Sequence, residues 1–290
     1  MSGKTVAELI DYGVRELRER GKPSPRLDVE LILAHVLGKD RLFLYMNPGL
    51  LPGFEAEREF CRLIGERIRG KPVQYIIGRQ EFMGLEFDVS SEVLIPRPDT
   101  EVLVESVIEW IKDSGRHNAV LADLGTGSGA IAVSLAYYIP DARVVAVDVS
   151  QEALEVAAHN AAKHGVSRRI RFVRGDLLEP FKAMGLEGGL DGIVSNPPYI
   201  PEEDMKGLQD EVKNEPALAL CGGSDGLDCY RRIAAGAPLY LARGGILAVE
   251  VGYNQAGDVA GIVGATGKFG PARVIRDLEG RERVVFFVTI

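Results

Sequence analysis

The segment Ser195-Asn196-Pro197-Pro198-Tyr199 combines groups that could hold a planar –NH2 group. Residues 190–194 before it are typical of a buried strand, and two consecutive prolines prevent that strand from continuing. The segment is therefore predicted to leave the sheet as a rigid, exposed loop. Asn196 and Pro197 offer carbonyl oxygens to the two hydrogens, and Tyr199 offers a flat face. A proline-rich strand end is also a common structural feature, so the neighbouring segments decide between the two interpretations.

A glycine-rich segment, residues 123–130 (DLGTGSGA), predicts a ligand-binding turn between a strand and a helix. Doubly wound folds bind ligands at such turns. Small residues let a ligand approach the backbone, and the following helix N-terminus favours a carboxylate or phosphate. The segment also fits the loose dinucleotide-binding pattern G-x-G-x-x-G/A, which alone is weak support. The candidate cofactor-binding residues here are Gly125, Thr126, Gly127, Ser128 and Gly129.

Two acidic residues end the next two predicted strands. Asp148 follows Gly125 by 23 positions, where a carboxylate can accept both hydroxyls of an adenosine ribose. Asp176 could accept the exocyclic amine of adenine, and Leu177 could offer its N–H and an apolar surface. Both acids are also typical turn residues. Four successive strand ends thus carry, in order, a glycine-rich turn, an acid, Gly-Asp-Leu and Asn-Pro-Pro-Tyr. This ordered set indicates a binding site more specifically than any one of the motifs.

Residues 1–71 are predicted to form a helical N-terminal substrate-recognition domain. Thr5 and Glu8 have capping-box spacing, and Pro25 suits the first turn of a second helix. Apolar spacing predicts further helices near 41–45 and over 55–69. This domain contains no evident catalytic cluster.

Residues 72–95 are predicted to form a β-hairpin linker, with strands over 73–78 and 85–89 around a Met83-Gly84 turn. Asp99 and Thr100 then offer possible caps for the next helix. Arg97, between two prolines, either faces a bound ligand or belongs to a stiff connector.

Residues 96–290 alternate strand and helix, which predicts an α/β, Rossmann-like domain with a doubly wound, mostly parallel sheet. A final pair of strands around Glu279-Gly280 predicts a C-terminal antiparallel hairpin. The predicted strands cover 119–124, 143–147, 170–173, 190–194, 245–251, 273–278 and 283–288. The predicted helices cover 128–139, 151–164 and 230–241.

The composition limits the classes of partner. Its 42 acidic and 34 basic residues give a net charge of −8, which disfavours a general binder of nucleic-acid backbones. No apolar run approaches the ~20 residues of a membrane span, and the N-terminus resembles an amphipathic segment rather than a signal peptide. Three cysteines without ligand spacing favour reduced thiols over a metal site. We expect a cytoplasmic protein with no metal, no membrane partner and no direct nucleic-acid partner.

The chain resembles class I S-adenosylmethionine-dependent methyltransferases, and specifically the HemK/PrmC family of protein-(glutamine-N5) methyltransferases. That family acts on class I peptide chain release factors, in translation termination. The resemblance covers nearly the whole length and rests on residues 96–101, 123–129, 148, 195–200 and 215–220. It implies S-adenosyl-L-methionine as cofactor, with S-adenosyl-L-homocysteine as product, bound by the glycine-rich loop and Asp148. Leu177, where some members have an aromatic residue, would also lie at the cofactor.

The resemblance also implies that Asn196, Pro197, Pro198 and Tyr199 hold the glutamine of the release factor's Gly-Gly-Gln tip. An amide nitrogen is a poor nucleophile because its lone pair is delocalised into the carbonyl. The Asn196 and Pro197 oxygens would accept its two N–H bonds, orient it towards the sulfonium methyl and stabilise developing positive charge. Tyr199 would pack on the amide. Asn196, Pro197 and Tyr199 are thus the candidate catalytic residues, and Asn196 would also adjoin the cofactor.

Three alternatives remain open. The same tetrapeptide suits N6-adenine methylation of DNA or RNA, once the base leaves the stack. The acidic catalytic domain, without a basic and aromatic-rich segment, disfavours that function. A non-catalytic partner-binding protein of this fold and a nicotinamide dehydrogenase fit less well, because neither needs the intact Asn-Pro-Pro-Tyr loop.

Overall fold

The computed structural model describes residues 3–290, so Met1 and Ser2 of the N-terminal segment lie outside the description. The chain forms two compact units. The first runs through Arg79 and includes Gln209–Asn214, and the second comprises Gln80–Leu208 and Glu215–Ile290. Each unit is described by itself.

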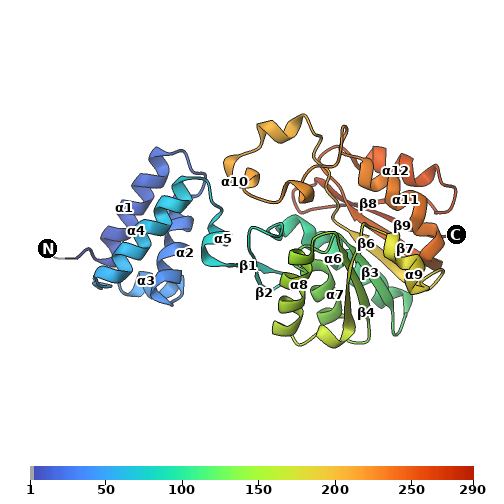
Figure 1. Ribbon diagram of the computed structural model, residues 1–290, viewed down its shortest axis with the longest axis horizontal. Helices are drawn as coiled ribbons and strands as arrows, with labels where there is room; N and C mark the ends of the chain where they lie inside the picture. The colour runs from blue at the N-terminus through green and yellow to red at the C-terminus, as the bar shows by residue number, and fades with distance from the viewer. Residues whose placement is uncertain (1–2) are drawn as a thin grey trace. The chain divides into compact units, whose positions relative to one another are not determined.

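The first unit is helical, as predicted (Figure 1). Thr5 caps its first helix: the hydroxyl accepts from the Glu8 N–H, and the Glu8 carboxylate accepts from the Thr5 N–H at 2.7 Å. Pro25 occupies the first turn of the second helix, where no N–H is needed. The helices are α1 (Val6–Glu19), α2 (Pro25–Leu37), α3 (Arg41–Met46), α4 (Phe54–Ile68), α5 (Val73–Ile77) and α10 (Asp210–Lys213).

A buried ion-pair cluster joins α10 to this bundle. The Arg67 guanidinium, only 4% exposed, lies 2.6 Å from the Asp28 carboxylate and 2.7 Å from that of Glu211. Burial raises the pKa of Asp28, and the charge of Arg67 opposes that rise. The contact explains why a segment remote in sequence belongs to the first unit.

The predicted strand over 73–78 is wrong, because Val73–Ile77 forms the helix α5. A short apolar run fits either a strand or a helix. In this run residues three and four apart share the buried side, which is the helical spacing. The hairpin strands are β1 (Arg79–Phe82) and β2 (Leu85–Asp88). The turn at Met83-Gly84 is confirmed, and both residues have positive φ, 52° and 68°.

The second unit contains a seven-stranded sheet in the order β5-β4-β3-β6-β7-β9-β8. Strands β3 to β7 are parallel, and β9 is antiparallel to both β7 and β8, so the predicted mixed sheet with its C-terminal hairpin is confirmed. The strands are β3 (Val120–Leu124), β4 (Arg143–Asp148), β5 (Ile170–Arg174), β6 (Leu190–Ser195), β7 (Leu241–Glu250), β8 (Arg273–Arg276) and β9 (Glu282–Val288).

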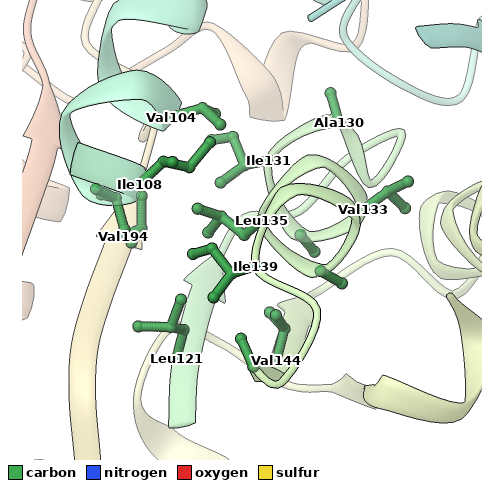
Figure 2. Packing of buried hydrophobic residues seen from close by; sticks show 14 of the residues in the cluster. Val104, Ile108, Leu121, Ala130, Ile131, Val133, Leu135, Ile139, Val144 and Val194 are labelled. Carbon is green, nitrogen blue, oxygen red and sulfur yellow. The ribbon is translucent and has the colours of Figure 1, made fainter. Parts of the chain in front are cut away.

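Helices cover both faces of this sheet (Figure 1). Successive strand residues alternate between two cores, so Leu121 packs with α6 and α7 while Ala122 packs on the opposite face. Figure 2 shows the first core, where Ile131 and Leu135 lie between the α6 side chains and the strands. The α-helices of this unit are α6 (Pro98–Ser114), α7 (Ala130–Tyr138), α8 (Gln151–Lys163), α9 (Glu179–Met184), α11 (Asp228–Tyr240) and α12 (Ala256–Gly264). Short 3₁₀ helices cover Ser167–Arg169, Asp204–Gly207 and Ala217–Ala219.

Helix α12 has no counterpart among the predicted elements, because its three glycines lower its helix propensity. Its buried residues, such as Val259, pack in the second core, and this packing compensates for the low helix propensity. Within residues 3–290, none of the helices combines the length and apolar character that a membrane crossing requires.

Candidate active site

The four predicted site segments lie together at one edge of the sheet. Leu124 at the end of β3 pairs with Val147 on one side and with Ser195 on the other. The Ser195 hydroxyl donates to the Leu124 carbonyl at 2.7 Å and joins the ends of β3 and β6. Strand order reverses at this point, and doubly wound sheets bind ligands in the crevice there.

A cavity of about 460 Å³ occupies this edge. Its volume is that of a typical site for a small molecule. Seven of the candidate residues line it: Gly125, Gly127, Asp148, Asp176, Leu177, Asn196 and Pro198. A second, smaller cavity of about 50 Å³ shares Leu94, Gly125, Gly127 and Asn196 with the first. The two spaces therefore adjoin at the glycine-rich loop and Asn196.

Carboxylates fix the glycine-rich loop. Gly125 and Gly127 have φ values of 73° and 52°, a backbone conformation that favours glycine. The Gly127 N–H donates to Asp148 Oδ2 at 2.9 Å, and the Thr126 hydroxyl donates to Asp123 at 2.6 Å. The loop is thus shaped by protein contacts before any ligand arrives.

The other loop residues take different positions. Thr126 and Ser128 are buried and line only the smaller cavity. The Ser128 carbonyl accepts from Asn160 Nδ2 at 2.9 Å. Gly129 lines neither cavity, and a Cβ there would come within 3.0 Å of Ala157. Gly129 therefore allows α7 and α8 to approach, and cofactor contact by these three residues stays a prediction.

Asp123 is a fully buried acid beneath the loop. Its Oδ2 accepts the Thr126 hydroxyl and the Ala132 N–H at 3.1 Å, while its Oδ1 has no partner among the described residues. Burial raises the pKa of Asp123 to about 7, and the charge of Asp148 adds to the rise. The sequence marked Asp123 only as the start of the motif.

Asp148 has both carboxylate oxygens facing backbone donors. Oδ2 accepts from Gly127, and Oδ1 accepts from the Ser150 N–H at 3.0 Å. Each carboxylate oxygen has a second lone pair, so the half-buried group can still accept ligand hydroxyls.

Asp176 and Leu177 line the cavity beside a residue that the sequence did not reveal. Arg232 of α11 also lines it and lies 2.8 Å from the Asp176 carboxylate. The oxygens predicted to accept an adenine amine are thus partly engaged by a cation. Leu177 has φ 52°, a conformation that costs energy in a residue other than glycine and that is common at functional sites.

Asn196 borders both cavities, and a hydrogen bond to α6 fixes its side chain. Its Nδ2 donates to the hydroxyl of the buried Thr100 at 3.1 Å. The predicted capping role of Asp99 and Thr100 is wrong: α6 begins at Pro98, with Arg97 as its N-cap. Pro98 needs no N–H partner and so can open the helix two residues earlier.

Pro197 and Tyr199 line neither cavity. Pro197 is buried, and the Tyr199 ring packs on the second core. Burial, and next the nearby carboxylate of Glu250, raise the pKa of Tyr199 to about 12, so its hydroxyl is neutral at physiological pH. The roles predicted for Pro197 and Tyr199 stay predictions.

An ion pair joins the Pro-Arg-Pro segment to the cavity wall. The Arg97 guanidinium contacts the buried carboxylate of Glu215, which also accepts the Ile95 N–H at 3.1 Å. Pro216 and Leu218, just after Glu215, line the larger cavity. Arg97 itself lines the smaller one, so it both stiffens the connector and faces the site.

Family models match both parts of the chain. The model described as "PrmC N-terminal domain" matches residues 8–78, and the one described as "Methyltransferase small domain" matches residues 86–215. The release factor glutamine methyltransferase of Moorella thermoacetica is 43% identical over 281 residues, covering 96% of each chain. That of Chlorobaculum tepidum is 44% identical over 286 residues, covering 96% of this chain and 95% of the other.

Solved structures give a further comparison. The protein-(glutamine-N5) methyltransferase (release factor-specific) from Alicyclobacillus acidocaldarius is 35% identical, covering 70% of this chain and 99% of that one, with TM-score 0.43. The hMettl16 catalytic domain, solved in complex with MAT2A 3′UTR hairpin 6, is 18% identical, with TM-score 0.57. It covers 76% of this chain and 82% of that chain. At that identity the likeness concerns the fold alone, the class I methyltransferase fold.

Proposed function

The chain belongs to the release factor glutamine methyltransferase family, and we propose that it methylates the side-chain amide nitrogen (N5) of glutamine in the Gly-Gly-Gln motif of class I peptide chain release factors. The methyl donor is S-adenosyl-L-methionine. The observation that carries the proposal is the position of Asn196, which borders both the larger cavity and the smaller one. A residue there can touch an acceptor and a donor at once.

The larger cavity fits this donor. Its volume of about 460 Å³ suits a nucleoside-sized ligand, and Asp148 presents carboxylate oxygens with unused lone pairs to ribose hydroxyls. Leu177 offers an apolar surface, and Gly125 and Gly127 leave the backbone accessible. When bound, S-adenosylmethionine supplies an electrophilic methyl group on a sulfonium.

Asn196, where the two cavities adjoin, is placed to hold the acceptor amide. Because Asn196 Nδ2 is occupied by Thr100, its Oδ1 is the end left to accept an N–H from the substrate. In this proposal the Pro197 carbonyl accepts the other N–H and Tyr199 covers the amide plane, which requires the amide to lie on the Pro197–Tyr199 side of Asn196, because these two residues line neither cavity. Two acceptors fix the direction of the nitrogen lone pair and stabilise positive charge that develops on that nitrogen. The neutral Tyr199 ring adds no competing charge.

In the same proposal the helical region recognises the substrate, with 1–71 as recognition domain, 72–95 as linker and 96–290 as methyltransferase domain. The match of residues 8–78 to the N-terminal family model supports a separate N-terminal domain. Release factors work with ribosomes, so the same proposal places the protein in the cytoplasm.

The test is to incubate the protein with methyl-labelled S-adenosylmethionine and a class I release factor, and to map the label. We expect one methyl on the Gly-Gly-Gln glutamine and none when that glutamine is replaced by alanine. DNA and RNA serve as parallel substrates, and label on an adenine there instead would favour the alternative function. Asn196→Ala should reduce turnover at least a hundredfold while cofactor binding and thermal unfolding stay close to wild type.

Gln80→Ala is a matched control, because this amide side chain of the same unit lines neither cavity. Near-normal turnover by Asn196→Ala would contradict the assigned role of Asn196.

A further inference from the structure

A fully buried amide lies behind the glycine-rich loop with no role assigned so far. Asn160 belongs to α8, is completely buried and lines neither cavity. Its Oδ1 accepts from the Asp88 N–H at 2.8 Å. Its Nδ2 donates to the Asp88 carbonyl at 3.0 Å and to the Ser128 carbonyl at 2.9 Å. One side chain therefore joins the end of β2 to the glycine-rich loop.

Each partner of Asn160 leads directly into a wall of the larger cavity. Ser128 follows Gly127, which lines that cavity as part of the glycine-rich loop. Asp88 ends β2, and the chain continues into residues 91–94, which line the same cavity as a second wall. Asn160 thus fixes the separation between two walls that are remote in sequence.

We propose that Asn160 is a positioning residue for the methyl donor: by holding the two walls at one separation, it keeps the larger cavity in the shape that S-adenosylmethionine requires. The inference rests on the proposed function, because it presupposes that the donor occupies this cavity. Asn160 acts through the two walls, since it lines neither cavity itself. Walls that are already fixed need not be ordered when the ligand binds, and this raises the affinity.

The three hydrogen bonds require an amide side chain. Asp88 presents one N–H and one C=O to Asn160, and Ser128 presents a second C=O. An amide has one acceptor oxygen and two N–H donors, which is the matching set. This match also fixes the direction of the amide, because turning it over would oppose like groups at each contact. In Asn160→Asp both donors would be lost, and in Asn160→Leu all three bonds would be lost.

The local structure brings Asn160 within reach of the loop. Ser128 precedes Gly129, the N-cap of α7, so the Ser128 carbonyl lies outside the helical hydrogen-bond pattern and needs another partner. A Cβ at Gly129 would come within 3.0 Å of Ala157, which lies about one turn before Asn160 on α8. The missing side chain at Gly129 therefore lets α8 approach closely enough for Asn160 to bind the Ser128 carbonyl.

Other contacts between α8 and β2 are exposed and serve as a comparison. The Lys163 ammonium lies 2.6 Å from the Asp88 carboxylate and 3.0 Å from that of Glu86. Exposed ion pairs contribute little to stability, because water and salt screen them. A buried carbonyl or N–H that loses its partner is much less favourable. Asn160, rather than the ion pairs, is therefore the contact that fixes β2 against the glycine-rich loop.

The test compares Asn160→Leu and Asn160→Asp with wild type in the full chain. Leucine and aspartate are both close to asparagine in size, so each variant removes hydrogen bonds without opening a large cavity. We expect the calorimetric Kd for S-adenosylhomocysteine and the KM for S-adenosylmethionine to rise about tenfold or more in both variants. The KM for release factor and kcat at saturating S-adenosylmethionine should stay within about twofold of wild type, because the three bonds lead to the walls around the donor and not to Asn196.

Lys163→Met is the matched control. It removes the exposed ion pairs with Glu86 and Asp88 and leaves the three bonds of Asn160 in place. Its Kd for S-adenosylhomocysteine should equal that of wild type. Fluorescence of the single tryptophan, Trp110, checks that each variant is folded. A loss of stability alone lowers the folded fraction but not the affinity of the folded protein, so the Kd separates a positioning role from a purely structural one.

The two hypotheses fail differently. No glutamine methylation by the wild-type chain would overturn the proposed function. Methylation by the wild type together with a wild-type Kd for S-adenosylhomocysteine in both Asn160 variants would overturn only the positioning role, and so would an equal rise of that Kd in Lys163→Met. If Asn160→Leu does not fold, Asn160→Asp, which keeps the acceptor for the Asp88 N–H, decides the matter.

Discussion

Replacing Asp123 by asparagine should change how the stability of the second unit, which contains the candidate active site, depends on pH. Asp123 is completely buried, one of its oxygens has no partner among the described residues, and burial raises its pKa to about 7. An unfolded chain has an aspartate pKa of about 4. Between these two values the folded state holds a proton that the unfolded state has already lost, so the contribution of Asp123 to stability is greatest below about pH 4 and falls until about pH 7.

The size of the effect follows from that window. Each pH unit between the two pKa values contributes about 1.4 kcal/mol, so wild type loses about 3 kcal/mol from about pH 5 to about pH 8 through this group. Asparagine does not titrate, so the stability of Asp123→Asn relative to wild type should rise by the same amount. Its unpartnered –NH2 costs about 1–3 kcal/mol, but equally at every pH, and does not alter the slope.

Urea unfolding followed by Trp110 fluorescence measures this difference. Trp110 lies on α6 and packs against the first core, so its fluorescence reports the unfolding of the second unit. Glu250 is present in both proteins, and its own pH dependence cancels. Asp113→Asn, at an exposed position of α6, is the control. A difference between Asp123→Asn and wild type that stays constant from about pH 5 to about pH 8 would refute the reasoning.

Three further predictions concern other contacts. Asp148→Ala should weaken S-adenosylhomocysteine binding about 10- to 100-fold by calorimetry, because the ribose hydroxyls lose a charged acceptor; an unchanged Kd would contradict this. Gly222→Ala should lower kcat about tenfold, since the new Cβ would lie 2.6 Å from the Pro198 carbonyl and displace the loop; wild-type turnover would show that the loop adapts. Arg67→Met leaves the buried Asp28 unpaired and should cost the helical unit about 3–5 kcal/mol, measured by amide hydrogen exchange in α2 and α4.

The strand-end motifs could be predicted because their signals are local. Two prolines end β6, glycines with positive φ follow β3, and the carboxyl ends of parallel strands meet at one edge of a sheet. The alternation of strands and helices then predicts that the four segments lie together, and this prediction needs no knowledge of side-chain packing.

The remaining features depend on packing between segments remote in sequence. The run Val73–Ile77 fits either strand or helix by its apolar pattern, and tertiary contacts make it a helix. Glycine-rich α12 is held by the core rather than by propensity. Arg232 and Glu250 stand in segments that carry no motif, and only the fold brings them to the site.

Two buried acids, Asp123 of β3 and Glu250 of β7, lie on the strands that flank β6, the strand that Asn196 follows. Asp123 accepts from the Thr126 hydroxyl of the glycine-rich loop at 2.6 Å, whereas Oε2 of Glu250 has no partner among the described residues. The raised pKa of each acid means that each destabilises the fold once ionised. Such a cost is expected where function rather than stability determines the residue. Asp123 gives the Thr126 hydroxyl a fixed acceptor and so helps to keep the glycine-rich wall of the candidate site in one conformation.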